Sequence, residues 1–495
     1  MQRSQKTMDS FAERNTTESE KGRTEATSMD VTQSVEEKTT YDDLIPFVIA
    51  DDNIDMALKV VVGNRGAPGV DGMSVFGLEQ WLNTNRQELK DTIASGNYIP
   101  TPVRRVEIPK PNGGTRNLGI PTVKDRLVQQ MVAQVLGPIY DPTFSDASYG
   151  YRPGRSAQDA VMKVQEYYDQ GYTQAVGIDL AKFFDSLNQQ FLMNIIRIRI
   201  KDQVLIRLIK RFLRAGVVLP DGVVVSTTEG SSQGSPLSPL LSNIYLDLLD
   251  KELESRGLKH LRYADDSLIM LKSPRACQRV CESVTRYLEE ELKLKVNRDK
   301  TEIGSPKKLK FLGFVLTRRD KGAGIRPHQS AIAKFKKNVI AITKRNRGIS
   351  FDRMLVELNQ YLRGWIGYYG LSTSDDLMRR LAGWVRRRLR QYLFKQWKKT
   401  YTRFKSLRRL CPPYLRLADE DAVAMLWVAS CWKTAKMDSY WGASDTRPMT
   451  EGLDKRTLMN MGFMDFEGVW LHVRERCTNR RVPNGPHGGV RGQPT

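Results

Sequence analysis

Hydrophobic and polar residues follow two different periods along this chain, and the change from one to the other divides it. Between residues 100 and 320, short runs of alternating apolar and polar residues are separated by longer segments with apolar residues every three or four positions. Alternation is typical of half-buried strands, and the longer period is typical of amphipathic helices. Beyond residue 325 the helical period continues. The pattern therefore predicts an α+β part followed by an α-helical part.

Individual elements follow from this pattern and from the turn residues between them. The predicted strands are 103–109, 116–120, 174–180 and 309–315, together with a β-hairpin centred on Asp265. The predicted helices are 122–138, 156–170, 187–213, 236–255, 274–292, 329–346, 351–370 and 375–400. Segments 1–40 and 479–495 contain few large apolar side chains, and such composition cannot offset the entropy cost of ordering. We expect both segments to be disordered tails.

The composition favours a nucleic acid as partner. The 495 residues include 78 Lys and Arg against 56 Asp and Glu, which gives a formal charge of +22. This balance favours a polyanion, with nucleic acid ahead of an acidic membrane surface. The five cysteines show no disulfide spacing, the four histidines form no zinc pattern, and there is no run of about twenty apolar residues. We therefore expect a cytoplasmic, nucleoid-associated protein with no membrane span.

The helical part contains a run of basic residues with no acidic residues among them. Between Arg386 and Arg416 there are twelve Lys and Arg and no Asp or Glu, with aromatic residues among them. A solvated helix face is the alternative interpretation, but such a face usually carries acidic partners one turn away. Phosphate binding is favoured, because cations displace counterions and aromatic rings stack on bases. The predicted contacts are Arg386, Arg387, Arg388, Arg390, Lys395 and Lys398.

Three carboxylates are candidates for a metal site. Asp265 and Asp266 lie at the tip of the predicted hairpin, and an exposed turn is the alternative interpretation. Asp179 ends the predicted strand 174–180, where a cap or an ion pair is the alternative. Adjacent carboxylates need a cation to offset their charge, and divalent metal is the usual one. If the strand and the hairpin are neighbours, these side chains can share two metal ions, which is the arrangement of a phosphoryl-transfer site.

Residues for a triphosphate are also present. Lys110 and Arg116 lie on the first predicted hairpin, where Arg can form a bidentate contact with phosphate. Gln233 lies in a loop of Gly, Ser and Pro before the helix 236–255, and its amide can hydrogen-bond a sugar or a base. An ordinary charged hairpin and a generic loop are the alternatives for these two segments.

The same residues fall into ordered sequence blocks. The blocks are 116–126 (RNLGIPTVKDR), 148–156 (SYGYRPGRS), 179–185 (DLAKFFD), 232–243 (SQGSPLSPLLSN), 262–266 (RYADD), 294–301 (LKVNRDKT) and 311–314 (FLGF). Two further segments, 361–369 (YLRGWIGYY) and 386–398, follow them. In this order the blocks resemble the bacterial group II intron reverse transcriptase/maturase family.

The resemblance implies a fold and an activity. It implies a right-hand polymerase with fingers and palm at 41–320, an α-helical thumb/maturase domain at 325–415 and a helical DNA-binding region at 420–478. Such a protein is an RNA-directed DNA polymerase that reverse transcribes its intron from a DNA primer during retrohoming. It also binds group II intron RNA and assists splicing. The expected substrates are dNTPs, the expected cofactor is two Mg²⁺ ions with Mn²⁺ as a possible substitute, and the expected state is a monomer or homodimer.

The resemblance also gives roles to particular residues. Asp179, Asp265 and Asp266 would be the catalytic carboxylates, and the Leu180 carbonyl would be a further metal ligand. Phe184, or its neighbour Phe183, would exclude the 2′-hydroxyl of a ribonucleotide. Lys110 and Arg116 would bind the triphosphate, and Gln233 would line the nucleotide pocket.

The chain departs from the family at two places. Ser232 and Ser235 stand where the family usually has Pro and Gly, so we expect altered kinetics or fidelity, with Ser235 adding a hydroxyl near the nucleotide. Residues 440–495 hold only His472, Cys477 and His487 as metal-binding types, so we expect no zinc-dependent HNH nuclease. That absence resembles the endonuclease-lacking lineages, often with class C introns.

Two rival interpretations remain. The first is an RNA-binding splicing factor with a relict polymerase core, which would have lost its carboxylates. The second is a reverse transcriptase that now serves repair or phage defence, apart from any intron. A group II intron RNA flanking the coding sequence would separate the mobile form from the second rival.

Overall fold

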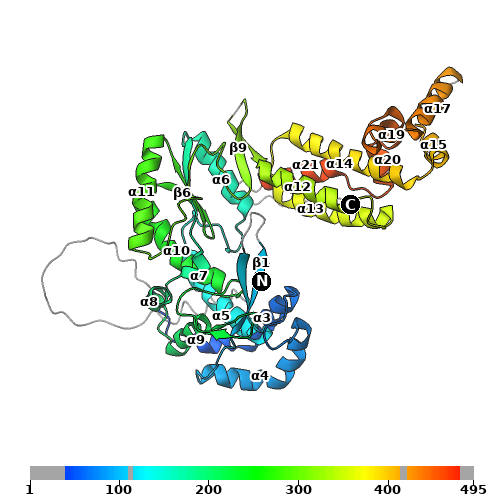
Figure 1. Ribbon diagram of the computed structural model, residues 1–495. Helices are drawn as coiled ribbons and strands as arrows, with labels where there is room; N and C mark the ends of the chain where they lie inside the picture. The colour runs from blue at the N-terminus through cyan, green and yellow to red at the C-terminus, as the bar shows by residue number, and fades with distance from the viewer. Residues whose placement is uncertain (1–38, 110–114, 321, 413–420, 480–495) are drawn as a thin grey trace, which may run out of the picture. The chain divides into compact units, whose positions relative to one another are not determined.

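The computed structural model describes residues 39–109, 115–320, 322–412 and 421–479 (Figure 1). The described residues from Tyr41 onward belong to one compact unit, which is described below by itself. Lys110 and nearly all of both predicted tails lie outside the described residues, so the predictions for them are untested. No helix in these ranges is both long enough and apolar enough to cross a membrane.

The first elements form a helical layer and a small sheet. They are α2 (Ile45–Val48), α3 (Asp51–Gly63), η1 (Val75–Gly77), α4 (Leu78–Ala94), β1 (Val103–Pro109), β2 (Thr115–Ile120), α5 (Val123–Tyr140) and η2 (Asp141–Thr143). Later elements add α8 (Gln189–Arg199), α9 (Gln203–Leu213), β4 (Val217–Val218) and β5 (Val224–Val225), which completes the strand order β2-β1-β4-β5. The antiparallel pairing of β1 with β2 confirms the first predicted hairpin.

A buried carboxylate joins two parts of this layer. Asp202 accepts hydrogen bonds from the backbone N–H groups of Leu44 and Ile45 at 2.8 and 3.0 Å, at the start of α2. Its other oxygen accepts from Val204 and Leu205 and so caps α9. Capping satisfies N–H groups that have no partner within a helix. Asp202 therefore fixes two helix starts that are distant in sequence.

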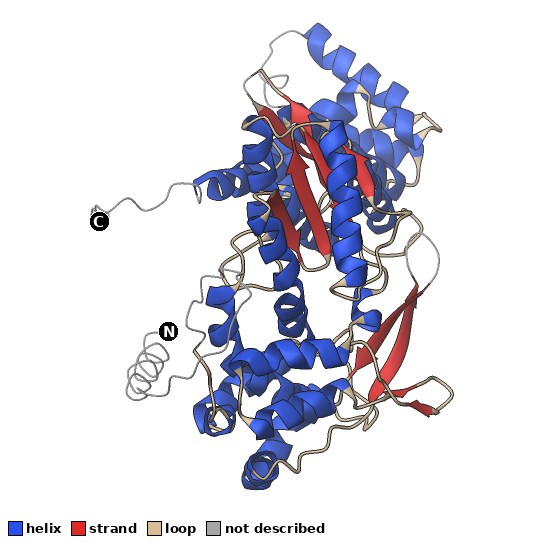
Figure 2. Ribbon diagram, turned by 90° about the vertical axis from the view of Figure 1, so that its left-hand side faces the viewer, coloured by secondary structure: helices blue, strands red, loops and turns tan. Residues whose placement is uncertain are grey.

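The central sheet carries the predicted carboxylates. Its strands are β6 (Lys259–Tyr263), β7 (Asp266–Leu271), β3 (Gln174–Ile178) and β8 (Glu302–Gly304), in this order and all antiparallel. The helices beside it are α6 (Ala157–Asp169), α10 (Ser238–Ser255) and α11 (Pro274–Glu290). Figure 2 shows the strands in red with helices packed along them. Leu268 and Met270 share a core with Val164 of α6, and α11 contacts β3, so helices cover the sheet.

The predicted strand 309–315 is wrong in position. The strand β9 begins at Phe314 and runs to Arg318, and it pairs with β10 (Ala323–Pro327), which was not predicted. A turn precedes it, because Leu312 and Gly313 have φ of +49° and +80°. An extended strand cannot continue through two left-handed residues. Five of the seven residues 309–315 are apolar, so hydrophobic periodicity alone did not indicate the turn.

The helical part has a single hydrophobic core. Its helices are α12 (Gln329–Ile342), α13 (Phe351–Tyr369), α14 (Asp375–Gln396), α15 (Thr400–Arg409), α17 (Asp421–Ala435), α18 (Tyr440–Ala443), α19 (Arg447–Gly452), α20 (Lys455–Asn460) and α21 (Phe466–Asn479). Phe335, Trp365, Leu389, Trp427 and Phe466 all belong to one buried cluster. Helices on both sides of residues 413–420 therefore pack together, and the predicted division into 325–415 and 420–478 stays a prediction.

Two of the predicted helices end earlier than expected. The helix predicted at 329–346 ends at Ile342 in the structure. Just after this end, Arg388 donates hydrogen bonds to the carbonyl and hydroxyl oxygens of Thr343. A cation that satisfies the last carbonyls stabilises a helix end. The helix predicted at 375–400 ends at Gln396 in the structure.

Candidate active site

The predicted hairpin around Asp265 is present. Tyr263 pairs with Asp266 across β6 and β7, which leaves Ala264 and Asp265 as a two-residue turn. Ala264 has φ of +59°, as the tight turns of β-hairpins require at their first residue. The turn places Asp265 and Asp266 at one end of the central sheet.

Asp179 reaches the same end of the sheet from β3. Ile178, the residue before it, pairs with Ser267, the residue after Asp266. The carboxylates therefore influence one another. Burial raises the pKa of Asp266 to about 6, and the charges of Asp265 and Asp179 act in the same direction. Burial also raises the pKa of Asp265, again with a contribution from Asp179. Clustered carboxylates with raised pKa values are the electrostatic condition that a divalent cation relieves.

Backbone pairing fixes the segment that carries Asp179. The Asp179 carbonyl accepts from Asn297 N–H, and Ala181 N–H donates to the Lys295 carbonyl, both at 2.8 Å. Backbone groups of successive residues in a strand point to opposite edges. The Leu180 carbonyl is therefore directed to the other edge, on the side of β7. This orientation is compatible with its expected role as a metal ligand.

One cation at the site was not assigned from the sequence. Lys300 Nζ lies 3.6 Å from Asp179 Oδ2, and the Lys300 side chain is 66% exposed. Its position in the block 294–301 was the available signal, but spacing alone did not indicate which carboxylate it faces. The pair partly offsets the carboxylate charge. In the part of the chain that the structure describes, no three His, Cys, Asp or Glu side chains form a ready-made metal site.

Arg116 and Gln233 come together at the site. Arg116 Nε donates to Gln233 Oε1 at 2.7 Å, and Gly119 N–H donates to the Gln233 carbonyl at 2.9 Å. The loop thus lies along β2. Gly234 has φ of +116°, and a Cβ there would stand 2.7 Å from the Gly119 carbonyl oxygen. The charge of Arg116 also lowers the pKa of Asp265, so this pair lies within electrostatic reach of the carboxylates.

The two phenylalanines after Asp179 differ in their surroundings. Phe183 is 2% exposed and packs edge-on against Tyr245 of α10, with ring centroids 6.3 Å apart. Phe184 is 8% exposed, and its carbonyl accepts from Ser231 N–H. The short helix α7 (Phe183–Ser186) carries both. Both rings are therefore buried, and Phe183 is the more fully enclosed of the two.

Ser235 is bonded within the fold. Its hydroxyl donates to Gln129 Oε1 of α5 at 2.7 Å, and the residue is buried. Its expected effect on kinetics or fidelity stays a prediction. At Ser232 the carbonyl accepts from Ser238 Oγ at 2.9 Å, a bond that ties the loop to the first turn of α10.

The arginines of α14 are engaged within the helical part. Arg386 pairs with Glu467 at 3.0 Å, and the Arg387 guanidinium lies 3.9 Å from the centroid of the Trp441 ring. Arg390 is 9% exposed and donates to the Ser444 carbonyl, and burial lowers its pKa to about 10. Arg388 binds Thr343, as described above. Of the remaining predicted contacts, Lys395 is half-buried and Lys398 is exposed.

Exposed cations gather instead on α12. Between residues 329 and 350 there is no Asp or Glu. The exposed lysines of this segment are Lys334, Lys336, Lys337 and Lys344. The sequence prediction did not include these lysines, because basic residues are denser on α14. Periodicity also does not reveal which arginines a neighbouring helix will bind.

Comparison with known proteins supplies the family. Residues 108–316 match the model "Reverse transcriptase (RNA-dependent DNA polymerase)", and residues 332–411 match "Group II intron, maturase-specific domain". The Escherichia coli (strain K12) protein YkfC is 34% identical over 287 residues, which covers 50% of this chain and 75% of that protein. The group II intron-encoded protein LtrA of Lactococcus lactis subsp. cremoris is 29% identical over 443 residues, covering 68% and 72%.

A yeast relative extends the comparison. The putative COX1/OXI3 intron 2 protein of Saccharomyces cerevisiae is 28% identical over 399 residues, covering 63% of this chain and 46% of that protein. Reverse transcriptase domains use divalent metal ions, which agrees with the carboxylates at the end of the central sheet. The chain is an RNA-directed DNA polymerase with a right-hand fold, and it belongs to the family of group II intron reverse transcriptases and maturases.

Proposed function

We propose that this chain copies group II intron RNA into DNA from the 3′ end of a DNA primer, and that Asp179, Asp265 and Asp266 form its polymerase site. The observation that carries the assignment is the meeting of β3 with the β6–β7 turn. It brings together three carboxylates whose predicted roles rested on separate sequence blocks. The same protein binds the intron RNA and assists its splicing, as the maturase-specific match supports.

Divalent metal fits the donor set. The three carboxylates and the Leu180 carbonyl are oxygen ligands, which Mg²⁺ prefers. The raised pKa values of Asp265 and Asp266 indicate negative charge that lacks sufficient compensation from the protein. These residues would hold two Mg²⁺ ions, with Mn²⁺ as a substitute. When bound, such ions activate the attacking hydroxyl and stabilise the charge that develops on the phosphate.

The nucleotide would bind beside the side chains of Arg116 on β2 and Gln233 in the adjoining loop. Arg116 is exposed and can exchange its hydrogen bond to Gln233 for a bidentate contact with phosphate. Lys110, in the segment between β1 and β2, would add a second positive charge. Phe184 would exclude the 2′-hydroxyl, since its neighbour Phe183 is committed to packing against Tyr245.

For RNA we assign the main contacts to lysines. Lys395 and Lys398 remain from the predicted set, and Lys334, Lys337 and Lys344 of the acid-free α12 region join them. The arginines of α14 would act indirectly, by joining α14 to α12 and to the helices after residue 420. Residues 420–478 would contact target or primer DNA. The active form would be a monomer or homodimer in the cytoplasm, associated with the nucleoid.

Primer extension tests this function. The wild-type chain should extend a DNA primer on an RNA template with dNTPs and Mg²⁺. Asp265→Ala should abolish extension while intron RNA binding stays within about twofold, because the lysines lie outside the site. Wild-type extension by Asp265→Ala would refute the site. If the wild-type chain bound intron RNA but never extended a primer, the splicing factor with a relict core would be correct.

A further inference from the structure

Arg262 is the largest of the fully buried side chains in the described part of the chain. It is the first residue of the block 262–266, which contains Asp265 and Asp266, yet it is 1% exposed. Each of its N–H groups has an acceptor. Nε donates to both oxygens of Asp250 at 2.9 Å, and Nη2 donates to Asp250 Oδ2 at 2.6 Å and to Ser148 Oγ at 2.8 Å. Nη1 donates to Asn243 Oδ1 at 3.0 Å and to the Ala264 carbonyl at 3.1 Å.

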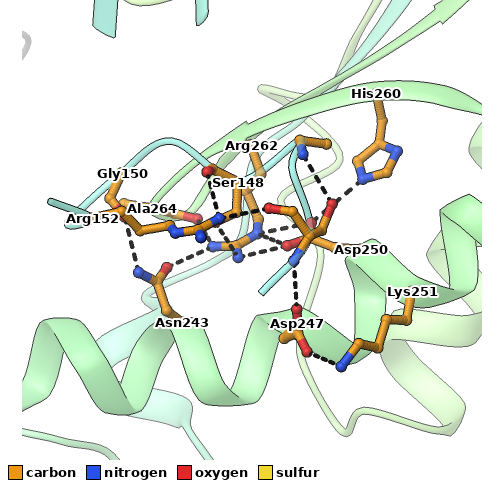
Figure 3. Close-up of polar contacts among 12 residues, drawn as sticks. Ser148, Gly150, Arg152, Asn243, Asp247, Asp250, Lys251, His260, Arg262 and Ala264 are labelled. Carbon is orange, nitrogen blue, oxygen red and sulfur yellow. Dashed lines mark hydrogen bonds and ion pairs between the residues drawn. The ribbon is translucent and has the colours of Figure 1, made fainter. Parts of the chain in front are cut away.

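The acceptors of this guanidinium come from three parts of the chain (Figure 3). Asp250 and Asn243 lie on α10, Ser148 lies in the segment before α6, and Ala264 is the first residue of the catalytic turn. Asp250, Asn243 and Ser148 are each fully buried. A planar guanidinium with all five hydrogens bonded has one orientation, and a lysine ammonium cannot reproduce it.

The turn is held from a second direction. Asn243 Nδ2 donates to the Gly150 carbonyl at 2.9 Å. A Cβ on Gly150 would stand 2.3 Å from the Ala264 nitrogen and 2.9 Å from the Tyr263 carbonyl carbon. The Gly150 backbone therefore touches the peptide that leads into Asp265. Asn243 thus contacts both supports of the turn, the guanidinium and Gly150.

We propose that Arg262, held by Asp250, is a positioning residue for the polymerase reaction: it fixes the Ala264–Asp265 turn and thereby the spacing of the carboxylates. The same contacts join the turn to α10, whose preceding loop carries Gln233. The inference rests on the proposed roles of Asp265 and Asp266. Groups that orient metal ligands typically change metal affinity or activity by about 10–100-fold when they are removed.

Arg262→Lys tests the proposal, and Arg152→Lys is its matched control. Arg152 is also buried and also pairs with an aspartate, Asp141, at 2.7 Å. Its other hydrogen bonds go to the carbonyls of Asp141, Ser145 and Ser148, so it does not bond to the turn. For each variant, kcat, the dNTP KM, the Mg²⁺ concentration for half-maximal rate and the melting temperature are measured on an RNA template with a DNA primer.

Arg262→Lys should lower kcat by roughly tenfold or more and raise the Mg²⁺ requirement severalfold, with the dNTP KM changed less. Arg152→Lys should lower the melting temperature similarly while its Mg²⁺ requirement stays at the wild-type value. Equal Mg²⁺ requirements in both variants would overturn the proposal and leave Arg262 as a structural residue.

A second variant keeps the proposal testable if Arg262→Lys fails to fold. If Arg262→Lys does not fold, Asn243→Ala removes one acceptor of the guanidinium and its bond to Gly150, and it should also raise the Mg²⁺ requirement. An unchanged requirement in Asn243→Ala would overturn the proposal. Asp265→Ala is measured in parallel: if it retains activity, the site assignment itself fails, whereas failure of the Arg262 variants alone refutes only the positioning role.

Discussion

Arg116 Nε donates a 2.7 Å hydrogen bond to Gln233 Oε1, so two residues predicted to bind the nucleotide also bind each other. A triphosphate must compete with this bond for the guanidinium. We predict that Gln233→Glu raises the dNTP KM by roughly tenfold, because a carboxylate adds its negative charge to a hydrogen bond that the Arg116 guanidinium already makes charge-assisted. Gln233→Met, which cannot accept the bond, is the control for lost pocket contacts. A KM for Gln233→Glu no higher than that of Gln233→Met would contradict the competition.

Gly150→Ala should impair polymerisation. Its Cβ would stand 2.3 Å from the Ala264 nitrogen, which is backbone and cannot move without displacing the catalytic turn. We predict a loss of kcat of at least about tenfold, measured by primer extension with saturating dNTP. Gly137→Ala on α5 is the control, since a Cβ there has no heavy atom within 4 Å. Wild-type kcat in Gly150→Ala would show that the turn tolerates displacement.

Phe184→Ala should increase ribonucleotide incorporation. The side chain is the less buried of the two phenylalanines on α7, and its removal leaves room for a 2′-hydroxyl. The ratio of kcat/KM for rNTP and dNTP measures this effect. Phe183→Ala is the comparison: it should leave the ratio unchanged and cost about 3–5 kcal/mol of stability, because Phe183 is buried against Tyr245. The reverse pattern would assign the selection to Phe183.

Substitution of Lys334, Lys337 and Lys344 together by Gln should weaken RNA binding and its salt dependence. Each phosphate contact contributes about 0.7–0.9 to the slope of log K against log salt concentration. We predict a slope smaller by about 2–3, measured by equilibrium binding of intron RNA. Arg388→Gln is the comparison, since this arginine is bonded to Thr343. It should lower thermal stability with little change in slope. If Arg388→Gln alone strongly changed the slope of log K against log salt concentration, α14 would be the helix that contacts RNA.

The carboxylates could be predicted from the sequence because a turn and a strand end are local features. Strand pairing then brought Asp179 beside the hairpin, as the alternation of apolar residues in β3 had indicated. The positioning role of Arg262 could not be predicted in this way. In the sequence it is a basic residue before a turn, and its partner Ser148 lies more than a hundred residues earlier.

The misplaced strand has a physical cause. Leu312 and Gly313 lie in an apolar run, and nothing in the periodicity reveals their left-handed conformation. The RNA contacts on α14 stay a prediction, although Glu467 and Ser444, on elements that fold against α14, bind two of its arginines. Tertiary contacts, which a local pattern does not contain, decided which cations remain exposed.

Primer extension by Asp179→Asn on an RNA template measures the two-element site most directly. The substitution removes one charge with almost no change in volume, and Asp179 directly follows β3 while Asp265 lies in the β6–β7 turn. If the three carboxylates form one metal-dependent site, extension should fall by at least about a thousandfold, with RNA binding and melting temperature retained. Extension at the wild-type rate would contradict the site and the polymerase mechanism built on it.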